Sequence, residues 1–128
     1  MKTYTISDLH GYPVDKFKAL LDKANFSDTD TLYILGDVID RNGDGGVSLL
    51  RYIMAQPNFG FILGNHEDML LKSRLVIEER TEAGKALGIE YFESLSEYSC
   101  WMLNGGGTSA RSVGRRSGRG KRSIRLFE

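Results

Sequence analysis

Three short clusters of polar residues carry the side-chain types that hold metal ions and phosphates. They are Asp8-Leu9-His10, Gly36-Asp37-Val38-Ile39-Asp40-Arg41 and Gly64-Asn65-His66-Glu67. Carboxylate, imidazole and amide groups together suit Mn, Fe or Zn ions better than a soft metal. Two such ions about 4 Å apart can clamp a phosphate and make a bridging water acidic enough to attack it near neutral pH. The clusters therefore predict a metal-dependent phosphate site.

The residue types within the clusters suggest that some bind metal, one binds phosphate and others transfer a proton. Asp8 and His10 are two residues apart, so in an extended chain their side chains point to the same side and can reach one cation. A carboxylate between two cations, here Asp37, would be needed to hold both. Further along the chain, Arg41 offers a planar fork for phosphate oxygens. His66 could protonate the leaving oxygen, oriented by a carboxylate such as Asp40.

Three strand-like runs must position these clusters, because each run ends directly before one of them. The runs are residues 2–7, 31–35 and 59–63. The second, Thr-Leu-Tyr-Ile-Leu, is continuously apolar, which predicts a strand buried on both faces. Parallel sheets gather ligand sites at the carboxyl ends of their strands. We therefore expect the three clusters to converge on one edge of the sheet.

Helical spacing of apolar residues separates the strand-like runs. It covers Val14–Ala24, Val47–Met54, the segment through Met69, Leu70 and Leu75, and Tyr91–Met102. This alternation of strand and helix predicts an α/β fold with a largely parallel sheet and flanking helices.

Composition narrows the class of protein and divides the chain in two. The 128 residues suit one domain, and a single cysteine, Cys100, excludes an internal disulfide and a cysteine-based zinc site. Residues 1–104 carry 10 basic and 16 acidic side chains, whereas residues 105–128 carry seven basic and one acidic. We expect a folded domain over 1–104 and an Arg/Gly/Ser-rich tail over 105–128 that is disordered or not native to the fold. No apolar run is long enough for a membrane helix or a signal peptide, which favours a cytoplasmic protein.

The motifs D-x-H, G-D-x-x-D-R and G-N-H-E, in this order and each after a strand-like run, resemble the first three motifs of the calcineurin-like metallophosphoesterases. The last two resemble most closely the phosphoprotein-phosphatase branch, with its bacterial serine/threonine phosphatases and dinucleoside tetraphosphatases. The resemblance covers roughly residues 1 to 70. It implies that residues 1–104 are the N-terminal portion of a phosphoesterase domain, with the first half of a layered β-sheet sandwich. It also implies hydrolysis of phosphate esters with two divalent ions (Mn, Fe or Zn).

The resemblance also implies a role for each motif residue. The first metal would be bound by Asp8 and His10, and Asp37 would bridge both metals. Asn65 would bind the second metal. The catalytic residues would be His66 as general acid, Asp40 as the residue that orients it, and Arg41 as the phosphate clamp.

The sequence departs from the family pattern in two places. Asn42 stands where the family usually has a glycine, and asparagine can adopt the same left-handed turn. The family also supplies further histidines downstream, whereas this chain has none after His66. We therefore expect the second metal site to be incomplete. The chain would then be the amino-terminal part of a longer phosphatase, truncated or frameshifted near residues 108–112, with impaired activity.

Several alternatives remain at this point. The substrate could be a phosphoprotein, a dinucleoside polyphosphate or a small phosphoester, since all three classes share these motifs. The basic tail could instead bind nucleic acid through non-specific phosphate contacts, although it lacks interleaved aromatic residues for base stacking. Glu67 lies at an expected helix start, where an acid meets the helix dipole favourably and need do no more.

Overall fold

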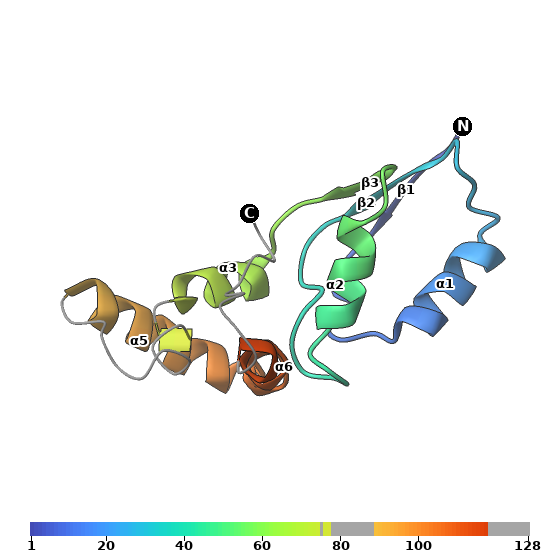
Figure 1. Cartoon of the computed structure of the whole chain (residues 1–128). Coiled ribbons are helices and arrows are strands. Elements are labelled where there is room, and N and C mark those ends of the chain that lie inside the picture. The colour runs from blue at the N-terminus through green and yellow to red at the C-terminus, as the bar shows by residue number, and fades with distance from the viewer. Residues whose placement is uncertain (75, 78–88, 118–128) are drawn as a thin grey trace.

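The chain was analysed as a computed structural model that describes residues 1–74, 76–77 and 89–117. Strands and helices alternate through the first half, and helices alone follow (Figure 1). The elements are β1 (Thr3–Ile6), α1 (Val14–Lys23), β2 (Thr31–Ile34), α2 (Val47–Met54), β3 (Phe59–Phe61), α3 (Asn65–Lys72), α5 (Ile89–Leu103) and α6 (Gly107–Ser117). Leu75, which the sequence analysis placed in the third helix, lies outside the described residues.

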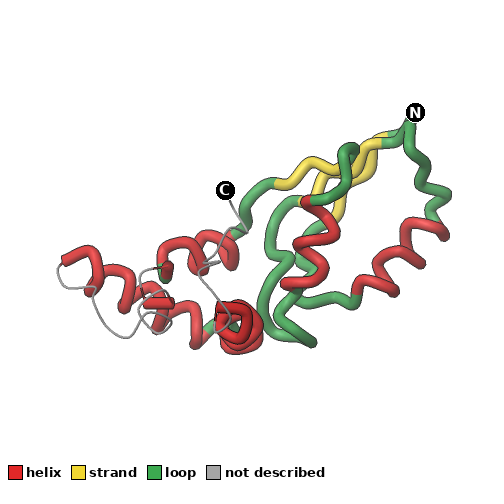
Figure 2. The backbone as a smooth tube through the Cα atoms, viewed as in Figure 1, coloured by secondary structure: helices red, strands yellow, loops and turns green. Residues whose placement is uncertain are grey.

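The three strands form a parallel sheet in the order β1-β2-β3, which confirms the predicted fold class. Thr3 pairs with Thr31, and Ile34 pairs with both Ile6 and Phe61. Parallel strands need a crossover between them, and α1 and α2 supply these crossovers. Long loops leave the carboxyl ends of β1 and β2, where the polar motifs lie (Figure 2).

Among the described residues, helices cover one face of this sheet and not the other. The side chains on the covered face come from alternate strand positions: Tyr4, Ile6, Leu32, Ile34, Phe59 and Phe61. Leu32 and Ile34 are buried with Phe17 of α1 and with Leu50 and Ile53 of α2.

The expectation that residues 31–35 are buried on both faces is wrong. Tyr33 is 44% exposed and Leu35 is 47% exposed, while their neighbours Leu32 and Ile34 are buried. The physical reason is that the core builds on one side only: the buried cluster contains the alternate residues, together with α1 and α2.

The second half of the chain is helical and packs beside the end of the sheet where the motifs lie. Helix α3 follows β3 and packs against α5, and α6 packs against α2 (Figure 1). Trp101 near the end of α5 and Ser109 of α6 are fully buried. Val113 of α6 is also buried, with 9% exposure.

The structure therefore differs from the expected tail over residues 107–117, which form a helix, and residues 118–128 lie outside the described part. A few small or apolar side chains are enough to pack α6 against α2, although the segment as a whole is basic and glycine-rich. That residues 105–128 are foreign to the fold stays a prediction. Among the described residues, no helix is long and apolar enough to cross a membrane.

Candidate active site

Two motif glycines bring the loops after β2 and β3 into direct contact. A Cβ atom on Gly36 would lie 2.4 Å from the Cα of Gly64, and a Cβ on Gly64 would lie 2.4 Å from Oδ1 of Asp37. Gly36 also has φ = 81°, a conformation that side chains rarely adopt. Any larger residue at these positions would push the loops apart, so the glycines explain how two motifs reach one place.

Left-handed backbone is concentrated at the motifs. The described non-glycine residues with positive φ are Asp8, His10, Asn25, Asp37, Asp40 and Arg41. Only Asn25 lies outside the motifs. Such conformations cost about 1–3 kcal/mol each and persist where surrounding contacts over-determine them, often at functional sites. Asn42, the expected left-handed residue, is not among them; its Nδ2 instead donates to the backbone oxygen of His10 at 2.8 Å.

Asp8, His10 and Asp37 lie close enough to share one cation. One potential ligand atom from each lies within 4.8 Å of the other two, and we call these three residues the open cluster. Asp8 is exposed, while the other two are half-buried. Asp37 is held in place because its Oδ1 accepts the backbone N–H of His66 at 3.0 Å. The predicted convergence of the loops after β1 and β2 is therefore confirmed. The expected extended chain at Asp8 and His10 is wrong, because both residues lie beyond β1 in left-handed backbone, with φ of 56° and 38°. Their role as metal ligands stays a prediction.

A hydrogen bond presents His10 as a ligand. Its Nδ1 lies 3.0 Å from the backbone oxygen of Ile39, and because a carbonyl only accepts, Nδ1 carries the proton. The lone pair is then on Nε2, which lies 3.7 Å from Oδ1 of Asp8. This is the arrangement in which a histidine binds a metal through one nitrogen while the other is fixed by the protein. The donors of the open cluster therefore fit a single divalent ion.

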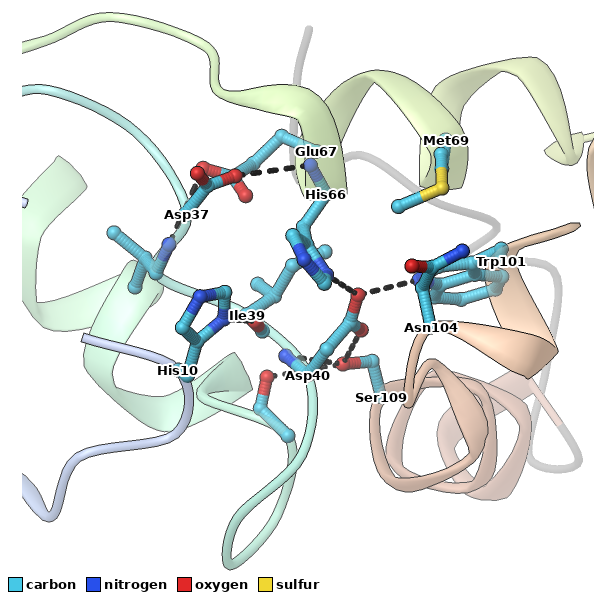
Figure 3. Close-up of polar contacts among 12 residues, drawn as sticks. His10, Asp37, Ile39, Asp40, His66, Glu67, Met69, Trp101, Asn104 and Ser109 are labelled. Carbon is cyan, nitrogen blue, oxygen red and sulfur yellow. Dashed lines mark hydrogen bonds and ion pairs between the residues drawn. The ribbon is translucent and has the colours of Figure 1, made fainter. Parts of the chain in front are cut away.

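A second group of polar side chains lies beside the open cluster but is fully enclosed. Oδ2 of Asp40 accepts hydrogen bonds from Nδ1 of His66 and Nε1 of Trp101, both at 2.7 Å (Figure 3). Oδ1 of the same carboxylate accepts the Ser109 hydroxyl. We call Asp40, His66, Trp101 and Ser109 the buried cluster, since none is more than 7% exposed. The rings of His10 and His66 meet edge to face, with centroids 4.5 Å apart, so the two clusters adjoin.

The loop between the clusters and α2 is held by residues from the far end of the chain. The backbone N–H of Arg41 donates to the backbone oxygen of Gly105 at 3.0 Å. The Ser112 hydroxyl donates to the backbone oxygen of Asp44 at 2.6 Å. Arg41 as a residue is exposed. Its backbone is therefore fixed although the residue is accessible to solvent, and its role as a phosphate clamp stays a prediction.

Glu67 does more than meet a helix dipole. Its side chain is completely buried, and Oε1 accepts the backbone N–H of Val38 at 3.3 Å, while Oε2 is buried with no hydrogen-bond partner. Burial raises the pKa of this carboxyl, and the neighbouring charge of Asp37 adds to the rise, although the Val38 N–H opposes it. The burial of Glu67 could not be predicted from its position, because acids at a helix start are commonly exposed.

Asn65, the predicted ligand of the second metal, is exposed at the first residue of α3. Among the described residues, the open cluster is the one group of three acidic, histidine or cysteine side chains placed to hold an ion. The role of Asn65 and the incomplete second metal site stay predictions.

Trp101 and Ser109 are the site residues that sequence reasoning missed. Trp101 reads as core by its helical spacing, and Ser109 lies in the Arg/Gly/Ser-rich segment. The three glycines between them, Gly105 to Gly107, are a signal in the sequence. Consecutive glycines can mark a place where other atoms approach the backbone closely. Gly106 does so: a Cβ there would lie 2.5 Å from Nε1 of Trp101.

The sequence was compared with known protein families. A family model described as calcineurin-like phosphoesterase matches residues 1–121. The chain belongs to this family. The phosphoesterase motifs, the parallel sheet and the site geometry are thus all in agreement on the family.

Curated relatives share part of this phosphoesterase sequence. Symmetrical bis(5'-nucleosyl)-tetraphosphatases from Salmonella paratyphi B, Salmonella newport and Salmonella agona are each 44% identical to the chain over 73 residues. The matched segment covers 56% of this chain and 25% of each relative. The similarity therefore spans about a quarter of the length of these relatives.

Proposed function

We propose that this chain is a metal-dependent phosphoric ester hydrolase that binds its ion at the open cluster. One observation carries the proposal: three ligand atoms able to share a cation lie beside a histidine whose other side is hydrogen-bonded to a buried carboxylate. The family match supports it, since the motifs fall in the matched segment. An ion and a proton donor side by side are what cleavage of a phosphate ester by water requires.

Each residue has a defined part in this proposal. Asp8, His10 and Asp37 would hold the ion, which when bound supplies positive charge that polarises phosphate and makes water a better nucleophile. The phosphorus–oxygen bond to the leaving group breaks as water attacks. In its imidazolium form, with a proton on each ring nitrogen, His66 gives the leaving oxygen the proton on Nε2, because Nδ1–H is committed to Asp40. The attacking water loses its proton to solvent, and His66 regains a proton from solvent.

Charge on the phosphate would be met by Arg41. Arg41 is exposed as a residue, and its backbone is fixed at φ = 74° by the bond to Gly105. A planar guanidinium binds two phosphate oxygens at once, which adds geometric selectivity to the charge attraction. Asn65, with the bridging Asp37, would contribute to a second metal site that needs further ligands.

For the substrate we propose a dinucleoside polyphosphate. The support is the name of the relatives, symmetrical bis(5'-nucleosyl)-tetraphosphatases, which are 44% identical to this chain over 73 residues. A phosphoprotein or a small phosphoester would use the same open cluster and is therefore a competing outcome of the same assay. Binding of nucleic acid by the basic segment is a different function; of its seven basic side chains only Arg111 is described, and it is exposed.

The experiment combines metal analysis with hydrolysis. The purified chain, stripped with chelator and reloaded with Mn²⁺, is assayed on diadenosine tetraphosphate, a phosphoserine peptide and 4-nitrophenyl phosphate. We expect bound metal and fastest hydrolysis of the dinucleotide, with both lost in Asp37→Asn and kept in Asp68→Asn. Asp68 is a matched control because it is an exposed acid on α3, paired with Lys72 at 2.8 Å and outside the open cluster.

The opposite result is equally clear. Wild-type protein that binds no transition metal at any loading has no hydrolase site of this kind. Metal-independent, salt-sensitive retention of RNA would point instead to the basic segment. Hydrolysis of the peptide or the small ester in preference to the dinucleotide would keep the hydrolase and replace the substrate.

A further inference from the structure

Helices α5 and α6 reach into the candidate site through two side chains. We propose that Trp101 and Ser109 are positioning residues, which hold the Asp40 carboxylate so that it fixes the orientation and tautomer of His66. The catalytic consequence rests on the proposed function, whereas the positioning itself is a property of the folded chain. Neither residue belongs to the open cluster, and each donates a hydrogen bond to Asp40, so both act through that carboxylate.

The contacts to the carboxylate leave it one orientation. Nε1–H of Trp101 and Nδ1–H of His66 both point at Oδ2, each at 2.7 Å, and the Ser109 hydroxyl donates to Oδ1 at 2.5 Å. Three donors on two oxygens fix the plane of the carboxylate as well as its place. Because Asp40 and Trp101 are 0% exposed, water cannot substitute for a lost donor without entering the core.

The backbone of Asp40 needs the same support. Its φ is 79°, which a side chain-bearing residue holds only against a cost. Its N–H points at both the backbone oxygen of Gly45, at 2.8 Å, and Oγ of Ser109, at 3.0 Å. Ser109 therefore contacts Asp40 twice, at the backbone N–H and at the carboxylate. A serine hydroxyl can do both because it accepts and donates.

Two glycines are needed for these side chains to reach Asp40. A Cβ on Gly45 would lie 2.4 Å from Oγ of Ser109 and 2.3 Å from its backbone nitrogen. A Cβ on Gly106 would lie 2.5 Å from the indole of Trp101. Gly45 thus allows α6 to approach the Asp40 loop, and Gly106 allows the indole to lie against the turn before α6.

The consequence for His66 concerns which nitrogen is free. A carboxylate fixed opposite Nδ1 keeps the proton on that nitrogen and leaves Nε2 to exchange a proton with substrate. If the carboxylate could rotate, Nδ1 would lose its partner and the imidazole its orientation. Trp101 and Ser109 thus support proton transfer without contacting substrate.

The test uses nitrogen NMR on the full, metal-free chain. It contains only two histidines, so the imidazole region holds signals from His10 and His66 alone. His10 is an internal control, since its Nδ1 is held by Ile39 and not by Asp40. The variants are Trp101→Phe, which keeps an aromatic ring and removes the N–H donor, and Ser109→Ala. Ser112→Ala is the matched control, because Ser112 lies on the same helix and bonds the same loop at Asp44.

We expect neutral His66 to be mainly the Nδ1–H tautomer in the wild type and in Ser112→Ala. In Trp101→Phe and Ser109→Ala, the ratio of Nδ1–H to Nε2–H should fall about tenfold, the effect of weakening one charge-assisted hydrogen bond. His10 should not change. If the His66 ratio is unchanged in both variants, or if Ser112→Ala alters it as much as Ser109→Ala, the proposal is wrong. Ser109→Ala decides the question if Trp101→Phe does not fold.

A kinetic readout connects positioning to chemistry. Loss of a positioned acid slows esters with poor leaving groups, whereas 2,4-dinitrophenolate leaves without a proton. We expect Ser109→Ala to lower kcat about tenfold on phenyl phosphate and to leave kcat on 2,4-dinitrophenyl phosphate within about twofold. An equal loss on both esters would contradict the proposal. Failure of the proposed function is distinguishable, because an inactive wild type would still report the His66 tautomer.

Discussion

The open cluster and the buried cluster share an edge but differ in how far their polar groups are satisfied. Asp8, His10 and Asp37 direct ligand atoms toward one another, and Asp8 is exposed to solvent. In the buried cluster, by contrast, every oxygen of the Asp40 carboxylate accepts a donor from His66, Trp101 or Ser109. The first arrangement gains from binding a cation, whereas the second is complete within the protein. An acid suited to an ion and an acid enclosed by hydrogen bonds thus lie only a few residues apart in the chain.

The largest difference in stability between the two clusters is expected when the Asp40 carboxylate is removed. Asp40→Ala leaves the donors of His66, Trp101 and Ser109 buried without their acceptor. We expect the free energy of unfolding to fall by about 3 kcal/mol or more, because an unpaired buried group is costly. Urea denaturation followed by tryptophan fluorescence measures this directly. A loss below about 1 kcal/mol would mean that the buried cluster is not a unit of stability.

Asp37→Asn should have the opposite profile. Asparagine tolerates the left-handed backbone at φ = 55°, and its side-chain oxygen can still accept the N–H of His66. Charge is what changes, so we expect Mn²⁺ to bind at least about 100-fold more weakly, since even outer partners of metal ligands cost 10–100-fold. Titration calorimetry on chelator-stripped protein checks this. Mn²⁺ affinity equal to wild type would remove Asp37 from the proposed ligands.

Glu67 is a buried acid whose protonation makes the free energy of unfolding depend on pH. Because burial raises its pKa in the folded protein, the folded state binds a proton more readily than the unfolded chain. Stability therefore falls as the pH rises from the ordinary glutamate range, near 4.5, through the raised pKa. Glu67→Gln keeps an acceptor for Val38 without the charge. We expect it to be more stable than wild type at neutral pH and equal to it at low pH.

Urea midpoints of both proteins, measured with chelator present at pH values from about 4 to about 7, give the comparison. Chelator is needed because a cation beside Asp37 would alter the charge that Glu67 experiences. Parallel curves for the two proteins would show that Glu67 does not titrate differently on folding.

The smallest stability effect is expected at the exposed member of the open cluster. Asp8→Asn should change the free energy of unfolding by no more than about 0.5 kcal/mol, since no buried partner is lost. The same variant should still weaken Mn²⁺ binding, because it removes a charged ligand. Urea denaturation and calorimetry on one preparation test both statements. A stability loss comparable to that of Asp40→Ala would abolish the distinction between the clusters.

How much the sequence predicts depends on how local a feature is. The strands, the helices over Val14–Lys23 and Val47–Met54, and the convergence of Asp8, His10 and Asp37 follow from periodicity and from the geometry of parallel sheets. The exposure of Tyr33 could not be predicted in this way. A continuous apolar run has no alternation of polar and apolar residues to show which face of the strand is exposed.

The contribution of Ser109 is the least visible in sequence. Its importance comes from one hydroxyl in contact with Asp40, 69 positions earlier, and no local pattern encodes such a pairing. The basic composition of residues 105–128 even argues against packing. The family resemblance covered the residues that would bind ions and phosphate, but not the helices that support them.

The distance along the chain between Asp40 and Ser109 has a consequence for the order of assembly. The open cluster draws on residues no later than Asp37, and the His66–Asp40 bond closes a loop of 26 residues. The bonds from Trp101 and Ser109 close loops of 61 and 69 residues, and long loops close at greater entropic cost. During synthesis, Asp8, His10 and Asp37 can thus come together while α6 is still in the ribosome. The bonds that Trp101 and Ser109 make to Asp40 are then the last of these contacts to form.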